Sequence, residues 1–187
     1  MSERIERLTS LDAARRQLNV AIRLFFERED MIAVHTLAAA VHGILLPIVK
    51  KRNPTGALDS FLNPENPRIV PERRKEYADI IRGAQNFFKH HVPRRTFDFN
   101  SDSTAFHIFD CIILLEKLEN GPRAPAIVVF EMWFFLKYPN AMAEGGLKQK
   151  LFNGRKMDPD NFETFLGAIK LAAKKGQLTS ARTDGGR

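Results

Sequence analysis

Hydrophobic residues along this chain recur mostly at spacings of three and four, the period of an α-helix that buries one side. The pattern begins after Ser10, a residue type favoured at helix N-caps, and continues to about Glu29. We therefore expect a first helix over this stretch, with Asp30 capping the next one. Its inward-facing positions are Leu11, Ala14, Leu18, Ala21, Ile22 and Phe25.

The second helix is expected over residues 31–51, and its first 19 residues, Met31–Val49, carry no charge. A stretch of about 20 apolar residues is long enough to cross a bilayer. This one also contains His35, His42 and Pro47, together with many alanines, which favours a central helix packed on most sides by other helices. We therefore expect no membrane association.

Further helical patterns follow, separated by stretches rich in proline, glycine and asparagine. The expected helices cover residues 71–90, 102–119, 125–138, 141–151 and 158–176. Residues 53–70 contain three prolines, are followed by a fourth at Pro71, and are expected to form a long ordered loop or a lid. Residues 96–100 alternate between apolar and polar side chains, but they have no partner strand and are also expected to form a loop.

The expected fold class is therefore all-α: an irregular bundle of six or seven helices with a central apolar helix. At 187 residues the chain suits a single domain, which we place at residues 1–176. Gly176 is expected to end the last helix. Residues 177–187 are then expected to form a disordered basic tail.

Cysteine content and the N-terminal sequence bear on the compartment. Cys111 is the only cysteine, which excludes an internal disulfide framework and a thiolate metal cluster. The first seven residues mix acidic and basic side chains, and no apolar segment of the secretory type follows. A cytoplasmic location is the resulting expectation. The sequence indicates no cofactor and no metal site, because the usual phosphate-loop, dinucleotide and zinc-helix motifs are absent.

The formal net charge of +7 is unevenly distributed along the chain. Residues 68–95 hold eight basic and three acidic side chains, whereas residues 98–119 hold five acidic ones and a single lysine. Such a basic segment can track a phosphate backbone, with Phe97 or Phe99 stacking on a base; a solvated surface is the alternative interpretation. The candidate nucleic-acid-binding residues are Arg73, Arg74, Lys75, Arg94 and Arg95.

A second candidate site lies near the end of the helix expected over residues 71–90. Arg82, Asn86 and His90 follow one another at intervals of four, and Lys89 flanks them. In RNA cleavage an imidazole moves a proton near neutral pH, while Arg or Lys stabilises charge on a phosphate. The alternative is a basic helix C-terminus, favourable through the helix dipole alone.

A third candidate is a pocket beside His35 and His42, which are seven residues apart and so lie on one face, about 10 Å apart along the helix axis. That separation is too large for them to share a metal ion directly. The alternative is that both are histidines hydrogen-bonded within a buried helix. Cys111 is expected to be a small buried hydrophobic residue rather than a nucleophile.

Three stretches carry a resemblance to a group of bacterial helical proteins with no established activity: Leu11–Leu18, Val34–Ala40 and Asn86–His90. The resemblance covers residues 8–138 and implies a helical fold.

The chain also resembles, more weakly, the HEPN superfamily, whose helical bundles include RNases of toxin–antitoxin and phage-defence systems. Those enzymes are typified by an Arg and a His on a helix with four to six intervening residues, usually brought together by dimerisation. Here seven residues separate Arg82 from His90. Arg28 and His35 have the permitted spacing, but they straddle an expected turn.

The function expected first is a non-catalytic module that binds a nucleic-acid or protein partner through a basic face, with RNA or another polyanion as the candidate ligand. The alternative is a metal-independent RNase of HEPN type, with His90, Arg82, Asn86 and Lys89 as its catalytic residues. A homodimer is compatible with either hypothesis.

Overall fold

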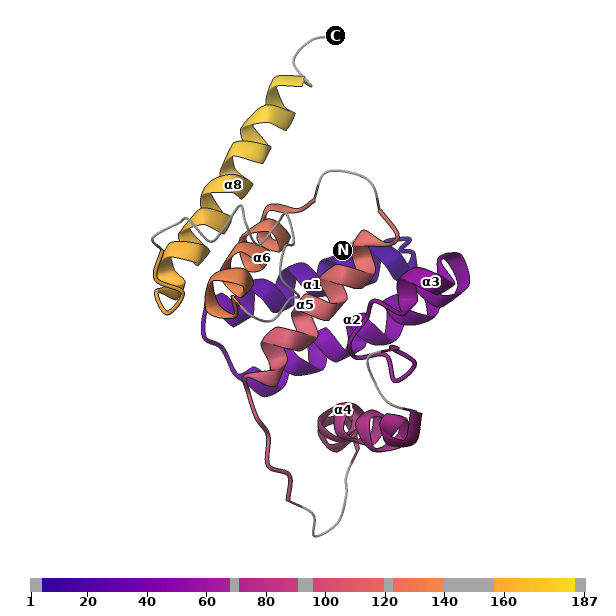
Figure 1. The fold of residues 1–187 in the computed structure, drawn as a ribbon. Coiled ribbons are helices and arrows are strands. Elements are labelled where there is room, and N and C mark those ends of the chain that lie inside the picture. Colours follow the sequence, from indigo (N-terminus) through magenta and orange to yellow (C-terminus); the bar gives the residue numbers. More distant parts are fainter. Residues whose placement is uncertain (1–4, 68–70, 91–95, 120–122, 140–156, 184–187) are drawn as a thin grey trace. The chain divides into compact units, whose positions relative to one another are not determined.

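The computed structural model describes residues 5–67, 71–90, 96–119, 123–139 and 157–183, and within these ranges it contains helices and no strand (Figure 1). The expected all-α fold class is thereby confirmed. The described helices are α1 (Ser10–Phe26), α2 (Met31–Arg52), α3 (Pro54–Ala57), the 3₁₀ helix η1 (Pro71–Arg73), α4 (Arg74–Lys89), α5 (Ser103–Glu116), α6 (Pro125–Lys137) and α8 (Phe162–Thr183).

Contacts between residues divide the chain into two compact units. The first comprises Met1–Ala21 and Asp30–Gly121, and the second comprises Ile22–Glu29 and Pro122–Arg187. Helix α1 contributes residues to both units. A single folding domain over residues 1–176 stays a prediction.

Helix α2 is the central element of the first unit. It packs most extensively against α5 and also contacts α3 and α4. This arrangement follows from its composition, because a helix without charged residues along most of its length buries several sides rather than one stripe. The expected central apolar helix is confirmed. Its buried residues are Val34, His35, Ala38, Ala39, Val41, Leu45 and Val49.

By length and composition alone, α2 is also the one described helix apolar enough to cross a membrane. The buried core helix of a water-soluble protein meets the same criteria. Here the hydrogen-bonding side chains His35 and His42 both face α5. The absence of membrane association stays a prediction.

The caps of the first two helices explain where each begins. Thr9, rather than Ser10 as expected, caps α1: its hydroxyl accepts from the Asp12 amide at 3.1 Å, and the Asp12 carboxylate accepts from the Thr9 amide. This reciprocal pair satisfies two backbone donors at once, which accounts for the shift of one residue. Asp30 caps α2 as expected, accepting from the amides of Ile32 and Ala33.

The turn between α1 and α2 ends the first helix sharply. The Arg28 amide donates to the Phe25 carbonyl and the Glu29 amide to the Leu24 carbonyl, the pair of bonds that defines a Schellman motif. Arg28 has a φ of 56°, the left-handed conformation that glycine usually supplies at this position. A non-glycine residue there costs about 1 kcal/mol.

The segment expected as a loop over residues 53–70 contains, in its described part, the short helix α3 and a series of turns. Asn53 caps α3 by accepting from the Gly56 amide at 2.9 Å. Two buried asparagines then hold the following turns, Asn63 donating to the Ala57 carbonyl and Asn66 to the Ser60 carbonyl, both at 3.0 Å. These side-chain amides supply hydrogen-bond donors in a stretch where the prolines have no backbone N–H to donate.

The second unit has an aromatic core. Phe25 and Phe26, at the end of α1, contact rings from α6 and from α8. Trp133 of α6 lies 4.8 Å from Phe25 between ring centroids, and its indole N–H donates to the Pro159 carbonyl at 2.8 Å. Phe165 of α8 is fully buried and stacks on Phe26 at 5.6 Å. These aromatic rings fill the centre of a unit made of few elements.

Two expectations about α8 were wrong. The helix begins at Phe162 instead of at Asp158, because Asp158–Asn161 form a turn in which Asn161 accepts from the Thr164 amide as a cap. It also runs past Gly176 to Thr183, so the backbone of residues 177–183 is helical. One glycine costs a helix only about 1 kcal/mol, and the residues around it are mostly good helix formers. The helix expected over residues 141–151 lies outside the described residues.

Candidate functional site

Three histidines form a row between α2 and α5 in the first unit. His35 and His42 lie on the same side of α2, as their spacing of seven predicts, and His107 of α5 lies against both. The ring centroid of His107 lies 4.8 Å from that of His35 and 5.5 Å from that of His42, and the His107 ring is nearly perpendicular to both. Two of the three, His35 and His107, are buried.

His35 is 3% exposed and only partly hydrogen-bonded. Its Nδ1 lies 3.3 Å from the Thr104 hydroxyl, whereas its Nε2 is buried and has no hydrogen-bond partner. Burial lowers the pKa of His35 to about 4. Burial, with the neighbouring His35 and His42, also holds the pKa of His107 well below its ordinary value. Both imidazoles are therefore neutral at pH 7.

Asp110, one turn after His107, is a fully buried carboxylate. Its Oδ2 accepts from the Ser60 hydroxyl at 2.7 Å and its Oδ1 from the Phe61 amide at 2.9 Å. His42 Nε2 lies 3.2 Å from Oδ2 without the alignment of a hydrogen bond. Asp110 thus fastens the turns after α3 to α5, directly beside the row of histidines.

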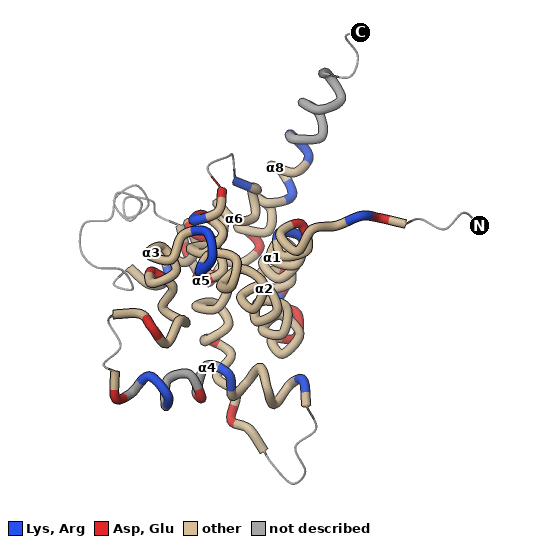
Figure 2. Tube along the Cα trace, turned by 90° about the vertical axis from the view of Figure 1, so that its right-hand side faces the viewer, with Lys and Arg blue, Asp and Glu red and all other residues tan. Residues whose placement is uncertain are grey.

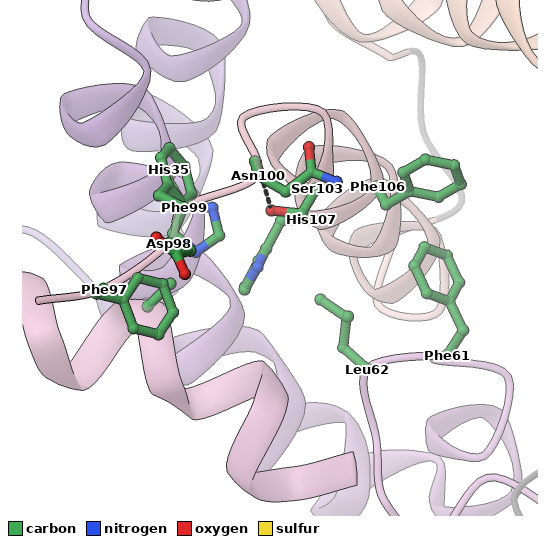
Figure 3. Close-up of a pocket in the computed structure, with 11 residues that line it drawn as sticks. His35, Phe61, Leu62, Phe97, Asp98, Phe99, Asn100, Ser103, Phe106 and His107 are labelled. Atoms are coloured by element: carbon green, nitrogen blue, oxygen red, sulfur yellow. Dashed lines mark hydrogen bonds between the residues drawn. The ribbon is translucent and has the colours of Figure 1, made fainter.

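A cavity of about 430 Å³ lies against this row (Figure 3). Helix α2 contributes His35 to its wall, α5 contributes His107, and the turns after α3 contribute Phe61 and Leu62. The close-up shows the His107 ring pointing into the space between Leu62 and Phe97. The other lining residues are Ala84, Phe97, Asp98, Phe99, Asn100, Ser103 and Phe106.

The histidine row does not have the arrangement of a metal centre. Among the described residues, no group of three His, Cys, Asp or Glu side chains is placed to hold a metal ion. Cys111 is fully buried, and its thiol donates to the Ala38 carbonyl at 3.3 Å. Burial and the neighbouring Asp110 raise the pKa of this thiol well above its ordinary value, so it is not a thiolate nucleophile.

The candidate catalytic residues of α4 all lie on its exposed side. Arg82, Asn86 and Lys89 are exposed, as is His90 directly after the helix, and their spacing together with that of Lys75 corresponds to one stripe. Figure 2 shows basic and acidic residues interspersed along α4. Their shared side follows from the helical spacing, and a catalytic role for these residues stays a prediction. The structure places no buried general base or second histidine beside His90 among the described residues.

The five candidate nucleic-acid-binding residues are less uniform. Lys75 is exposed, whereas Arg74 is half-buried with a buried Nε that has no hydrogen-bond partner. The backbone of Arg73 belongs to η1. Arg94 and Arg95 lie outside the described residues.

Two further expectations concern the rings of Phe97 and Phe99 and the pair Arg28 and His35. Phe97 stacks on Phe87 at 5.4 Å between ring centroids, Phe99 lies edge-on to Phe88 at 5.0 Å, and both rings line the cavity. Stacking of either ring on a base stays a prediction. The second expectation, that a turn separates Arg28 from His35, is confirmed. Arg28 donates to the Asp160 carbonyl at 3.2 Å from the turn that ends α1, whereas His35 lies inside α2. These two residues do not share a helix.

Sequence reasoning missed His107, Asp110, Thr104 and Ser60. A signal for three of them exists in α5, whose other residues are almost all apolar: Thr104, His107 and Asp110 recur at intervals of three. Polar residues at helical spacing within an apolar helix share one face, and buried polar groups need partners. Ser60 carries no comparable signal, because nothing local predicts which turn lies against α5.

Comparison of the chain with protein-family models, with curated proteins and with solved structures found no match. The all-helical character implied by the two resemblances is confirmed by the structure. Membership of the bacterial helical group or of the HEPN superfamily stays a prediction.

Proposed function

We propose that the protein is a non-catalytic helical module that binds single-stranded RNA through the exposed stripe of α4. The observation that carries the proposal is the alignment of three cations, Lys75, Arg82 and Lys89, with the hydrogen-bonding groups of Asn86 and His90 on one exposed side of a helix. Cations supply affinity for phosphates, and an amide or imidazole adds hydrogen bonds to sugar or base edges.

The charge on this stripe sets the expected strength of binding. Asp79 is also exposed on the same side of α4, between Lys75 and Arg82. Three phosphate contacts on a single strand give a slope of log K against log salt of about −2. Binding is therefore expected to be weak and to fall with salt. Its cationic part depends most on Lys89, because Lys75 and Arg82 each lie about one helical turn from the Asp79 carboxylate.

The test is fluorescence anisotropy of a labelled single-stranded RNA at about 50 and 200 mM salt. The double variant Arg82→Gln/Lys89→Gln is expected to bind at least about tenfold more weakly than the wild type at low salt. The matched control is Lys170→Gln/Lys174→Gln, which removes two exposed lysines from α8. An equal loss in both variants would show that only total charge matters, and would sink the proposal.

RNA cleavage is the second candidate function, favoured by the shared exposed stripe of Arg82, Asn86 and His90. It requires His90 to move the proton of the attacking 2′-hydroxyl while Arg82 or Lys89 stabilises the phosphate. The same labelled RNA, incubated with EDTA, distinguishes the two functions. Cleavage by the wild type that His90→Ala abolishes, with unchanged circular dichroism, would replace the binding proposal by an enzyme. If the wild type neither binds nor cleaves the RNA, the proposal fails, and a protein partner is the remaining hypothesis.

A further inference from the structure

The cavity beside the histidine row is independent of the α4 stripe and has its own chemistry. All of its lining residues belong to the first unit. We propose that it is a binding site for a small, uncharged, largely aromatic molecule that carries a hydrogen-bonding edge. The volume, the lining and the unpaired polar groups each support this assignment.

The volume is that of a ligand site rather than a packing defect. Packing defects in protein cores are few and seldom exceed the size of a water molecule. Ligand pockets occupy about 300–1,000 Å³, and this cavity of about 430 Å³ falls near the lower end of that range.

The lining selects against anions. Four phenylalanines contribute to the wall, and none of the described lining residues is a lysine or an arginine. Its two imidazoles, His35 and His107, are neutral at pH 7, and its single charged side chain is the carboxylate of Asp98. Aromatic walls favour offset or edge-on contact with an aromatic ligand. The four phenylalanines are Phe61, Phe97, Phe99 and Phe106.

The two histidines in the wall have ring nitrogens that are available to hydrogen-bond with a ligand. His35 Nε2 is buried without a partner, and the ring of His107 points into the cavity (Figure 3). An unpaired buried polar group costs about 1–3 kcal/mol, so a ligand that pairs with it gains affinity. A neutral imidazole offers one donor and one acceptor nitrogen, and a ligand edge carrying both kinds of group is complementary to either tautomer.

The test uses benzimidazole, an uncharged bicycle with one N–H donor and one acceptor nitrogen, and its hydrocarbon counterpart indene. Titration calorimetry and ligand-observed NMR are expected to show saturable one-to-one binding of benzimidazole to the full chain. Indene is expected to bind up to about tenfold more weakly, since it lacks the hydrogen bonds. Benzimidazole-5-carboxylate is expected not to bind, because the described lining residues include the Asp98 carboxylate and no lysine or arginine.

Two variants locate the site. Leu62→Trp fills the cavity from a half-buried position and is expected to abolish binding, whereas Leu171→Trp makes the same change on the exposed side of α8 and is expected to leave it unchanged. His107→Phe is expected to reduce the affinity for benzimidazole to that for indene, because the imidazole is lost, and to leave the affinity for indene unchanged. If His107→Phe does not fold, the tryptophan pair still decides the location. Absence of saturable binding by either probe, binding that Leu62→Trp leaves intact, or equal binding of the carboxylate would each overturn the proposal.

Discussion

The Ser60 hydroxyl donates to Asp110 Oδ2 at 2.7 Å, although the two residues are 50 positions apart in the sequence. The other oxygen of the same fully buried carboxylate accepts from the Phe61 amide at 2.9 Å. A charge buried this deeply is tolerated only where its lone pairs are satisfied. The Asp110 side chain therefore attaches the turns after α3 to α5. This attachment positions Phe61 and Leu62, which line the cavity.

Asp110→Ala is expected to destabilise the first unit by about 2–4 kcal/mol, because it leaves a buried hydroxyl and a backbone amide without acceptors. Ser60→Ala removes only one of the two bonds and is expected to cost about 1 kcal/mol. The measurement is urea unfolding followed by far-UV circular dichroism. Asp59→Ala is the matched control: it removes an exposed carboxylate from the same turn, whose ion pair with Lys117 is worth about 1 kcal/mol or less. Equal costs for Asp110→Ala and Asp59→Ala would contradict the assigned role.

The helices were predictable because their signals are local. The capping role of Asp30 and the end of the third long helix near His90 depend on residues within one or two turns, and the structure has both close to the expected positions. The start of α1 was displaced by one residue because Thr9 and Asp12 form a reciprocal pair that outcompetes Ser10. Such errors at helix ends arise where neighbouring residues are both good caps.

The candidate site was only partly predictable, because its formation depends on which helices pack together. The spacing of His35 and His42 places both on one face of α2, but nothing in α2 indicates that His107 lies between them. The partners of Asp110 lie 49 and 50 residues away in a proline-rich stretch. Periodicity predicts the side of a helix that is buried, and the identity of its neighbour comes from tertiary contacts.

Stability is expected to fall as the pH is lowered from about 6.5 to about 4. The folded pKa of His35 is lowered to about 4 by burial, so in this window the unfolded chain binds a proton that the folded chain does not. Each such histidine lowers the free energy of unfolding by up to about 1.4 kcal/mol per pH unit, and His107, shifted in the same direction, adds to the effect. Above pH 6.5 this contribution is flat.

The measurement for this pH dependence is urea unfolding at about pH 7, 5.5 and 4.5. His35→Phe is expected to flatten the decline, since the variant has one fewer proton to bind on unfolding. His90→Phe is the control, because His90 is exposed on α4. A decline in His35→Phe as steep as in the wild type would show that other groups, such as His107, dominate the acid response.

At the turn that ends α1, Arg28→Gly is expected to be more stable than Arg28→Ala by about 1 kcal/mol. Both variants lose the bond to the Asp160 carbonyl and the contact of the guanidinium with the Phe162 ring at 5.0 Å. Only the alanine variant keeps a Cβ at a φ of 56°. Urea unfolding followed by Trp133 fluorescence measures the difference; equal stabilities would mean that the turn relaxes out of the left-handed conformation.

Phe165→Ala is expected to destabilise the second unit by about 3–5 kcal/mol, because the ring is fully buried and stacked on Phe26. Trp133, the only tryptophan, belongs to this unit and reports on it alone. If residues 1–176 are one cooperative domain, Phe165→Ala moves the fluorescence and circular dichroism transitions together, and Asp110→Ala in the first unit moves the Trp133 transition as well. If the Trp133 midpoint in Asp110→Ala stays at the wild-type value while circular dichroism shifts, the two units unfold separately, because the loss in one is not transmitted to the other.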